Sequence, residues 1–427
     1  MPGFLTLDDV DVKGKTVLVR VDFNSPVDPE TKKILDDTRI KAHGKTTLKE
    51  LSEKGAKVVI LAHQGRPGDP DFIPLDQHAK RLGEILGKPV RYIDDLYGEE
   101  AKKAIRELKE GELILLKNTR SYPDERKSKS PEEHAKSEFI RELASLADLF
   151  VFDAFSAAHR SHASVVGFMA VLPSVAGRIM ERELKALSRV LESPEKPCVF
   201  ILGGAKADDS LKISQHVLSN RIADYVLTGG VTGHLFLAAT GVDLGKPNME
   251  LLEKQKVLDL IPGIKELMAK YPGKIKVPVD VAVDVEGRRE EISIQDLPTD
   301  YPILDIGTRT IKEYCKIINE AKSIVVSGPP GVYERKEFLK GTKEIFKAVA
   351  GSGAFSLVGG GHTVAAVQEL GLSDKMSYIS IAGGALIEFL AGSKLPAVAA
   401  LEKAAEKNHH NELSSGFTDP PHFWHPT

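Results

Sequence analysis

The chain has 427 residues, of which 42% are hydrophobic and 28% are charged, and its formal net charge is −3. This length exceeds what one ordinary hydrophobic core serves and predicts two domains of about 200 residues each. The near-neutral charge excludes a general basic surface for nucleic acid, so any anion chemistry must come from local clusters. With only Cys198 and Cys315, a disulfide framework and a four-thiolate metal site are excluded as well. The opening residues MPGFLTLDDV do not read as a signal peptide, and a cytoplasmic protein is expected.

In the first half, short apolar runs alternate with helical patterns. The expected strands are Thr16–Val21, Lys57–Leu61, Leu113–Leu116 and Leu149–Phe152. They lack in/out alternation, which is typical of parallel strands covered on both faces. Helices are expected at 40–54 and 75–86, each followed by a glycine, and a capping box at Ser130–Glu133 opens another.

The stretch Pro173–Leu191 has apolar residues at steps of three and four, which predicts an amphipathic helix capped by Ser174. We call it the spine helix, because the strand–helix alternation resumes after it. The further expected strands are Cys198–Leu202, Tyr225–Leu227, Val279–Val283, Ser323–Val326 and Phe355–Val358. Residues 225–242 lack charge but hold four glycines and His234, which favours strand, turn and buried helix over a membrane span. The sequence therefore predicts an α/β fold with two doubly wound, mainly parallel sheets, one on each side of the spine helix.

Polar residues follow each expected strand of the first half. In open α/β sheets the ligand lies beyond the carboxyl ends of the strands, so these residues should meet at one edge. The residues at these strand ends, polar except for Phe23 and Gly65, are Asp22, Phe23 and Asn24, then His63, Gln64, Gly65 and Arg66, then Arg120, then Asp153 with His159, Arg160 and His162. Arg39, at the start of the first helix, could join them. Any one of them could be a turn residue or a solvated charge. Together they predict a site for an anion with several oxygens, since arginine suits carboxylate and phosphate.

In the second half of the chain, glycine-rich turns rather than arginines follow the expected strands. One strand ends in Gly203-Gly204-Ala205-Lys206, another runs into Gly359–Thr363, and Gly383-Gly384 precedes a third helix. Such turns are often only tight turns, but glycine lets backbone N–H groups approach a phosphate at a helix N-terminus. No nucleophile elbow, paired carboxylates, HExxH or CxxC spacing is evident, so these motifs favour phosphoryl transfer.

Two other functions remain open on the residues alone. A dehydrogenase with two Rossmann-like domains would fit the strand–helix rhythm but needs a GxGxxG after a strand, which is not evident. A non-catalytic nucleotide- or anion-binding protein would fit the same clusters.

At these motifs the chain resembles the phosphoglycerate kinase family, with features of its archaeal branch, from about Thr16 to Leu401. The motifs that carry the resemblance are VRVDFNSP (19–26), AHQGRP (62–67), LLKNTR (115–120), DAFSAAHRSHAS (153–164), ILGGAK (201–206), DIGTRT (305–310), SGPPGVYE (327–334), VGGGHTVAA (358–366) and AGGALIEFL (382–390). The resemblance implies two domains that close about a hinge. It also implies a phosphotransferase of glycolysis and gluconeogenesis that moves phosphate reversibly from 1,3-bisphosphoglycerate to ADP, giving 3-phosphoglycerate and ATP.

The resemblance also implies the site residues. Arg39 and Lys206 are the expected catalytic residues. The expected 3-phosphoglycerate site comprises Asp22, Phe23, Asn24, Arg39, His63, Gln64, Gly65, Arg66, Arg120 and Arg160. The expected nucleotide site comprises Lys206, Glu334, Gly360, Gly361, His362 and Thr363.

Three residues depart from the common family pattern. His362 stands where an aspartate associated with the metal is usual, Ser210 where a second nucleotide lysine is usual, and Ser327 where an asparagine is usual. Lys212 is a candidate substitute for the lysine. Because of His362, we expect no protein ligand for Mg²⁺, which the nucleotide phosphates would hold.

The expected domains are 1–173, which binds 3-phosphoglycerate, and 174–401, which begins with the spine helix and binds nucleotide. The tail 402–427 is expected to return to the first domain. The expected partners are the substrates alone, without nucleic acid or membrane, in a monomer or homodimer.

Overall fold

The computed structural model describes residues 3–415, and side chains as far as Asn408. Its contacts divide the chain into two compact units. The N-terminal unit comprises the chain up to Arg182 and again from Lys394 onward, and the C-terminal unit is Glu183–Ser393. The division therefore falls nine residues later than the boundary expected after residue 173, and the domain assignment itself remains a prediction.

The N-terminal unit is built on a parallel six-stranded sheet with the order β3-β4-β2-β1-β5-β6. Its strands are β1 Thr16–Arg20, β2 Lys57–Leu61, β3 Val90–Tyr92, β4 Leu113–Leu115, β5 Leu149–Phe152 and β6 Ser174–Ala176. The four strands expected from the sequence are all present, and most of their side chains are buried. The sequence missed β3, a short strand that contains the charged Arg91, and β6, whose residues were included in the expected spine helix.

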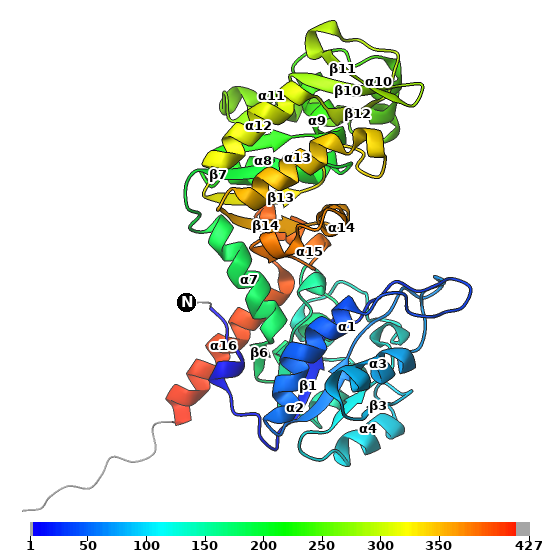
Figure 1. The fold of residues 1–427 in the computed structure, drawn as a ribbon. Helices are drawn as coiled ribbons and strands as arrows, with labels where there is room; N and C mark the ends of the chain where they lie inside the picture. The colour runs from blue at the N-terminus through cyan, green and yellow to red at the C-terminus, as the bar shows by residue number, and fades with distance from the viewer. Residues whose placement is uncertain (1–2, 416–427) are drawn as a thin grey trace, which may run out of the picture. The chain divides into compact units, whose positions relative to one another are not determined.

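Helices flank this sheet (Figure 1). They are α1 Thr38–His43, α2 Lys49–Glu53, α3 Asp76–Leu86, α4 Glu99–Arg106, α5 Pro131–His134 and α6 Glu138–Ala144. A π-helical turn at Gly44–Leu48 divides the single helix expected at 40–54. The capping box is confirmed, since Glu133 N donates to Ser130 Oγ and Ser130 N donates to Glu133 Oε2, both at 3.2 Å.

The helix α7, Arg178–Leu191, forms only the later part of the expected spine helix. Ser174 was wrongly expected to cap it, because Ser174 lies in β6 and pairs with Phe150 of β5. Asp153 accepts hydrogen bonds from the first-turn amides instead, from Ile179 N at 2.9 Å and from Met180 N at 3.3 Å. A Cβ at Gly177 would lie 2.2 Å from Asp153 Oδ1, so the turn before the helix requires glycine.

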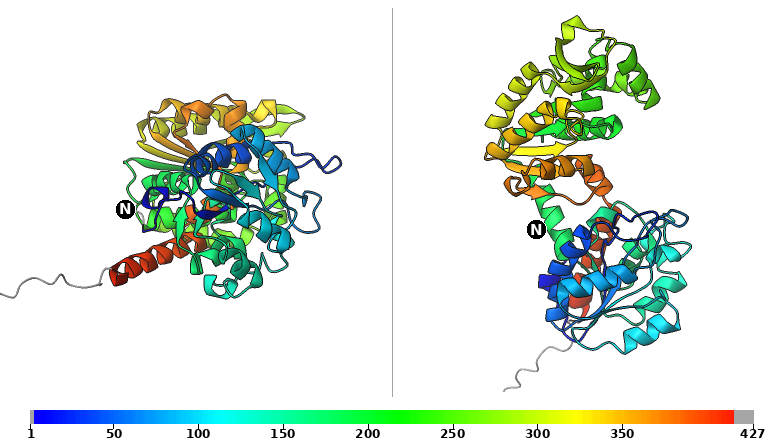
Figure 2. Two further views of the ribbon diagram at one scale, coloured as in Figure 1. Left: turned by 90° about the horizontal axis from the view of Figure 1, so that it is seen from below. Right: turned by 45° about the vertical axis from the view of Figure 1, so that its right-hand side comes forward.

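The C-terminal unit contains a second parallel six-stranded sheet, with the order β15-β14-β13-β7-β8-β9. Its strands are β7 Cys198–Leu202, β8 Tyr225–Thr228, β9 Ile275–Lys276, β13 Ser323–Ser327, β14 Phe355–Gly359 and β15 Tyr378–Ile379. Its helices are α8 Ala207–Ser219, α9 Gly230–Ala239, α10 Lys246–Lys254, α11 Ile261–Lys270, α12 Thr308–Glu320, α13 Lys340–Gly351, α14 Gly361–Glu369 and α15 Gly384–Leu390. Figure 2 shows the same ribbon from two further directions.

The run at Val279–Val283 was wrongly placed in a parallel sheet. It forms most of β10, Asp280–Val285, in a separate antiparallel sheet with β11 Arg288–Ser293 and β12 Ile303–Ile306. The turn Glu286-Gly287, with positive φ at both residues, joins β10 to the polar strand β11. An apolar run alone does not reveal which strand it pairs with.

The chain returns to the N-terminal unit in α16, Pro396–Ser415 (Figure 1). Ala397 N donates to Ala158 O at 3.1 Å, and Leu401, Ala404 and Ala405 are buried. The rest of the expected tail, 416–427, lies outside the described residues. Among residues 3–415, no helix is both long enough and apolar enough to cross a membrane.

Candidate active site

The polar residues expected at the carboxyl edge of the first sheet lie there in the N-terminal unit. Residues 22–24 follow β1, residues 63–66 follow β2, Arg120 lies in a short turn after β4, and Arg160 follows β5. Because β4, β2, β1 and β5 are adjacent and parallel, their carboxyl ends bring these residues to one edge.

Asp22 and Arg39 form the ion pair at the centre of this edge, with Arg39 Nη1 2.7 Å from Asp22 Oδ2. The Asp22 side chain is buried, whereas a third of the Arg39 side chain is exposed. Ser156 Oγ also donates to Asp22 Oδ2, and Asn24 N donates to Oδ1 at 2.9 Å. Burial alone would raise the pKa of Asp22, but Arg39 and these hydrogen bonds outweigh it and the pKa is lowered. Asp22 thus stays ionised and holds Arg39 in place.

Gly65 joins two of the expected site residues through its backbone. Its N–H donates to Asn24 Oδ1 at 2.9 Å, and its carbonyl accepts from Arg120 Nη1 at 2.6 Å. The φ angle of Gly65 is +66°, and a Cβ there would lie 2.6 Å from the carbonyl carbon of Asp71. Only glycine fits this turn.

The protonation of His63 follows from its contact with Arg20. Arg20 Nη2 lies 2.9 Å from His63 Nδ1. A guanidinium has only donors, so Nδ1 accepts and the imidazole proton is on Nε2. Burial, followed by the charges of Arg20, Arg120 and Arg160, holds the pKa of His63 well below its usual value. His63 is therefore a neutral side chain with Nε2–H as its donor.

Three arginines of this edge have no carboxylate partner. Among the described residues, Arg66, Arg120 and Arg160 form no ion pair within 4.0 Å, although Arg120 is buried and Arg160 is half-buried. Burial and the neighbouring charges of Arg20 and Arg160 lower the pKa of Arg120 to about 10. Cations held together without counter-charges favour binding of a multivalent anion.

Phe23 and Gln64, also expected in the site, direct their side chains into the protein. The Phe23 ring is buried and stacks on His78 with ring centroids 6.5 Å apart. Gln64 Nε2 donates to Ser25 O at 3.0 Å, and Gln64 Oε1 accepts from Ser25 N at 2.9 Å. Only the backbone of either residue is left to line the site.

Sequence reasoning missed a buried layer beneath the arginines. Glu125 Oε1 accepts hydrogen bonds from Ser164 Oγ at 2.7 Å and from Ser164 N at 3.0 Å, and Arg20 Nε donates to the same hydroxyl at 2.8 Å. Burial outweighs the charge of Arg20 and raises the pKa of Glu125 to about 7. The available signal was Arg20 itself, a charge within an otherwise apolar strand.

A buried histidine, His43, was also missed. Its Nε2 accepts from Asp22 N at 3.2 Å, so its Nδ1–H donates to Asp153 Oδ2, 2.7 Å away. Asp153 is the carboxylate that caps α7. A continuous chain of hydrogen bonds therefore runs from the first turn of α7 to the backbone of Asp22.

In the C-terminal unit, backbone segments pack directly against each other at the carboxyl edge of the sheet. Gly204 N donates to Pro329 O at 2.9 Å, and Gly230 N donates to Pro330 O at 2.8 Å. A Cβ at Gly203 would lie 2.4 Å from Pro329 O. The glycines expected to form phosphate turns thus also permit the close approach of the loop after β13.

Lys206 is exposed at the N-cap position of α8. Ser210, one turn later, is buried and lies 3.2 Å from the hydroxyl of Thr232. Lys212 is exposed and pairs with Asp208 at 3.2 Å. Positions two apart lie on different sides of a helix, so Lys212 extends from a different face of α8 than position 210.

The turn after β14 brings the other expected nucleotide residues together. Gly360 has a φ of +92° and precedes α14. Thr363 Oγ1 in the first turn of α14 accepts from Gly328 N at 2.7 Å, which ties the turn to the loop after β13. His362 is exposed, with Nδ1 3.8 Å from Glu334 Oε1.

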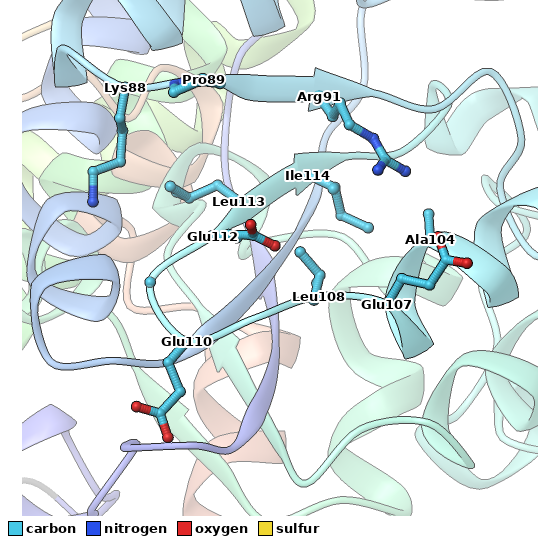
Figure 3. A pocket seen from close by; sticks show the side chains of 11 residues that line it. Lys88, Pro89, Arg91, Ala104, Glu107, Leu108, Glu110, Glu112, Leu113 and Ile114 are labelled. Carbon is cyan, nitrogen blue, oxygen red and sulfur yellow. The ribbon is translucent and has the colours of Figure 1, made fainter.

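Next to this turn, a cavity of about 230 Å³ opens between the loops. Gly204, Ala205, Glu334 and His362 line it together with mostly apolar side chains. A larger cavity of about 360 Å³ lies elsewhere, where Lys88, Pro89 and Leu113 mark the amino ends of β3 and β4 (Figure 3). That position is the opposite edge of the N-terminal sheet from the arginines, so it is not part of the anion site.

One α/β unit with a cation-lined edge and one with glycine turns at helix N-termini are typical of an enzyme that transfers phosphoryl groups. A sequence model of the phosphoglycerate kinase family matches residues 7–393. Phosphoglycerate kinases of Methanobacterium bryantii and Methanococcus maripaludis are 49% and 50% identical to the chain, cover 95% of it, and are themselves covered over 98% and 99%.

Solved structures agree with this finding. The phosphoglycerate kinase of Pyrococcus horikoshii matches with a TM-score of 0.86 and 43% identity, over 94% of this chain and 100% of that one. The enzyme of Coxiella burnetii matches with a TM-score of 0.81 and 34% identity, again over 94% and 100%. The chain belongs to the phosphoglycerate kinase family. The resemblance, the α/β fold class and the function as an ATP-binding transferase of glycolysis are confirmed, and the dehydrogenase is excluded.

Proposed function

We propose that the arginine-lined edge of the N-terminal unit binds 3-phosphoglycerate and 1,3-bisphosphoglycerate. The observation that carries this proposal is the group of cations without carboxylate partners beside the Asp22–Arg39 pair. The phosphate and carboxylate of the substrate would supply the missing negative charge. The proposed ligands are Asp22, Asn24, Arg39, His63, Arg66, Arg120 and Arg160, with backbone contributions from Phe23, Gln64 and Gly65.

ADP and ATP bind in the C-terminal unit in this proposal. The cavity of about 230 Å³ receives the base, and Glu334 at its margin is placed for the ribose. Gly360, Gly361, His362 and Thr363 form the start of α14, where N–H groups and the helix dipole favour a phosphate. Lys206 adds a mobile positive charge.

The chemistry needs little from the protein beyond position and charge. The phosphoryl group of the acyl phosphate in 1,3-bisphosphoglycerate passes to an oxygen of the ADP β-phosphate, and its bond to the carboxyl oxygen breaks, so the leaving group is the carboxylate of 3-phosphoglycerate. A carboxylate is a weak base, so its departure needs no general acid. Arg39 and Lys206 neutralise the charge on the equatorial oxygens of the phosphoryl group in the transition state.

Magnesium enters this scheme with the nucleotide, as Mg-ADP or Mg-ATP. Phosphate oxygens are the hard ligands that Mg²⁺ prefers, and the side chain at the turn is the imidazole of His362 rather than a carboxylate. Among the described residues, no cluster of three or more His, Cys, Asp or Glu could hold a metal. Calorimetry of ADP binding with and without Mg²⁺ tests this, since weak free Mg²⁺ binding together with strong Mg-ADP binding is expected.

The proposal extends to the domains and the setting. The first domain, 1–173 with the returning chain, binds the phosphoglycerate, and the domain that begins at residue 174 binds nucleotide. The two close about a hinge when both substrates are bound. The enzyme acts in the cytoplasm as a monomer or homodimer, without nucleic acid or a membrane.

A coupled assay of ATP formation from 1,3-bisphosphoglycerate and ADP tests the site assignment. Lys206→Ala is expected to lower kcat by about a hundredfold or more, as loss of a transition-state charge does. The exposed Arg91 on the edge strand β3, which is not among the proposed ligands, provides the control Arg91→Ala with unchanged kcat. Absence of ATP formation by the native chain would favour the non-catalytic binding protein instead.

A further inference from the structure

The cavity in the C-terminal unit has a volume of about 230 Å³. Pockets for whole drug-sized ligands measure about 300–1,000 Å³. This cavity is therefore suited to one ring system rather than to a complete nucleotide. Val231, Leu251 and Val332 are among its apolar lining residues, and they offer a flat heterocycle contact surface without fixing its orientation.

His234 is a polar side chain within this mostly apolar lining. It lies on α9, is only 7% exposed and lines the cavity. Of the other ionisable lining residues, Tyr333 is also buried, whereas Glu334 and His362 have side chains that are 55% and 81% exposed and lie toward solvent. The Nδ1 atom of His234 is buried and has no hydrogen-bond partner within the described part of the chain.

A buried polar atom without a partner is unfavourable, and such atoms are uncommon in folded proteins. Burial lowers the pKa of His234 to about 4, so the imidazole is neutral at pH 7. A neutral imidazole has one donor and one acceptor. Since His234 lines the cavity, the accessible edge of its ring can form a hydrogen bond with a ligand that enters, while no described residue pairs with its Nδ1.

We propose that His234 determines specificity for the nucleotide by hydrogen bonding to the polar edge of the purine base. This inference rests on the proposed binding of ADP in the C-terminal unit and adds a residue to it. An apolar cavity alone would accept any flat ring of suitable size. A hydrogen-bonding group within it discriminates against a ring that leaves that group unpaired.

Calorimetry with ADP and with pyrophosphate tests the proposal, because pyrophosphate carries the phosphates of ADP without the base. His234→Leu is expected to weaken ADP binding by about three- to tenfold, the effect of one neutral hydrogen bond. Pyrophosphate binding should not change. His234→Asn, whose amide can replace the ring nitrogen, should restore part of the ADP affinity.

Thermal unfolding without nucleotide separates this role from a purely structural one. Replacing an unpaired buried polar group by leucine should leave Tm unchanged or higher. If the leucine variant does not fold, His234→Phe provides the same test. Unchanged ADP affinity in a folded variant, or equal losses for ADP and pyrophosphate, would overturn the role of His234. If the native protein binds pyrophosphate but not ADP, the proposed function itself fails.

Discussion

Arg39 is ion-paired to Asp22, yet a third of its side chain remains exposed at the sheet edge. This arrangement supports the proposed catalytic role of Arg39, because a buried anion maintains its position while part of the guanidinium side chain stays accessible. Arg66, Arg120 and Arg160 are not held in this way by a carboxylate among the described residues. We therefore propose that their charges contribute mainly to binding of the substrate, whereas the charge of Arg39 stabilises the transition state.

Replacing Arg39 by alanine should therefore lower kcat about a hundredfold or more, because a charge on the transferring group is lost. The affinity for 3-phosphoglycerate, measured by calorimetry, should fall less than kcat, since three other arginines remain. Arg39→Lys keeps the charge but loses the planar guanidinium group, so its kcat should lie between those of the native enzyme and the alanine variant. A kcat close to that of the native enzyme in the alanine variant would exclude the catalytic role.

Glu125 provides a pH-dependent test at the same scale. Its pKa in the folded protein is raised to about 7 from the ordinary value of 4.5, with burial as the main cause. Between about pH 4.5 and pH 7, the folded protein therefore retains a proton on Glu125 that the unfolded chain releases. The contribution of this proton to the free energy of unfolding is complete below pH 4.5. It decreases as the pH rises to about 7, by roughly 3 kcal/mol in all.

The variant Glu125→Gln removes this titration while keeping the shape of the side chain. Thermal unfolding of both proteins between pH 4.5 and pH 8 should show Tm of the native protein falling relative to the variant as the pH rises. Parallel Tm profiles would mean that the Arg20 and Ser164 contacts keep Glu125 ionised throughout.

Sequence patterns predicted the positions of the candidate site residues at the sheet edge better than the contacts of their side chains. Arginines and glycines after apolar strands were recognisable because the carboxyl ends of parallel strands share an edge. The inward direction of Gln64 and the layer of Glu125 and His43 were not recognisable. Their partners lie 39 residues away in the case of Ser164 and 110 in the case of Asp153. Contacts so distant in the chain leave no local signal.

At the scale of elements, uniformly apolar runs gave reliable strands, and the failures have identifiable causes. The spine helix was drawn too long because Val175 and Ala176 continue its apolar pattern while lying in β6. The run 279–283 was assigned to the wrong sheet because burial on both faces is not unique to parallel strands. The sequence around Ser174 also does not show that the helix is capped by Asp153, which directly follows β5.

The glycine turn at β7 gives a test at this scale. In Gly203→Ala, the new Cβ would lie 2.4 Å from Pro329 O, a backbone atom that cannot turn aside as the end of a side chain could. The turn and the loop after β13 must separate, so ADP binding and Tm should both fall. Gly351→Ala at the end of α13 is the matched control, because nothing lies within 4 Å of its Cβ. Equal behaviour of the two variants in calorimetry and thermal unfolding would show that the close approach at Gly203 is not needed.

For the whole molecule, the two proposed sites carry like charges. The proposed phosphoglycerate site carries Arg39, Arg66, Arg120 and Arg160, and the proposed nucleotide site carries Lys206. Bringing these cations together without ligand is unfavourable, while the phosphates of both substrates neutralise them. The free energy for closing the proposed hinge should therefore come from both ligands together, and neither alone should suffice.

Small-angle X-ray scattering tests this expectation with 3-phosphoglycerate and Mg-ADP, a pair that binds without reacting. The radius of gyration should be smallest with both ligands, intermediate with either one, and largest without ligand. Raising the salt concentration to about 1 M, where the Debye length is about 3 Å, should reduce the difference between the free and singly bound states. Lys206→Ala should weaken the effect of Mg-ADP while leaving that of 3-phosphoglycerate intact. The same radius in all four states would rule out closure driven by neutralisation of these charges.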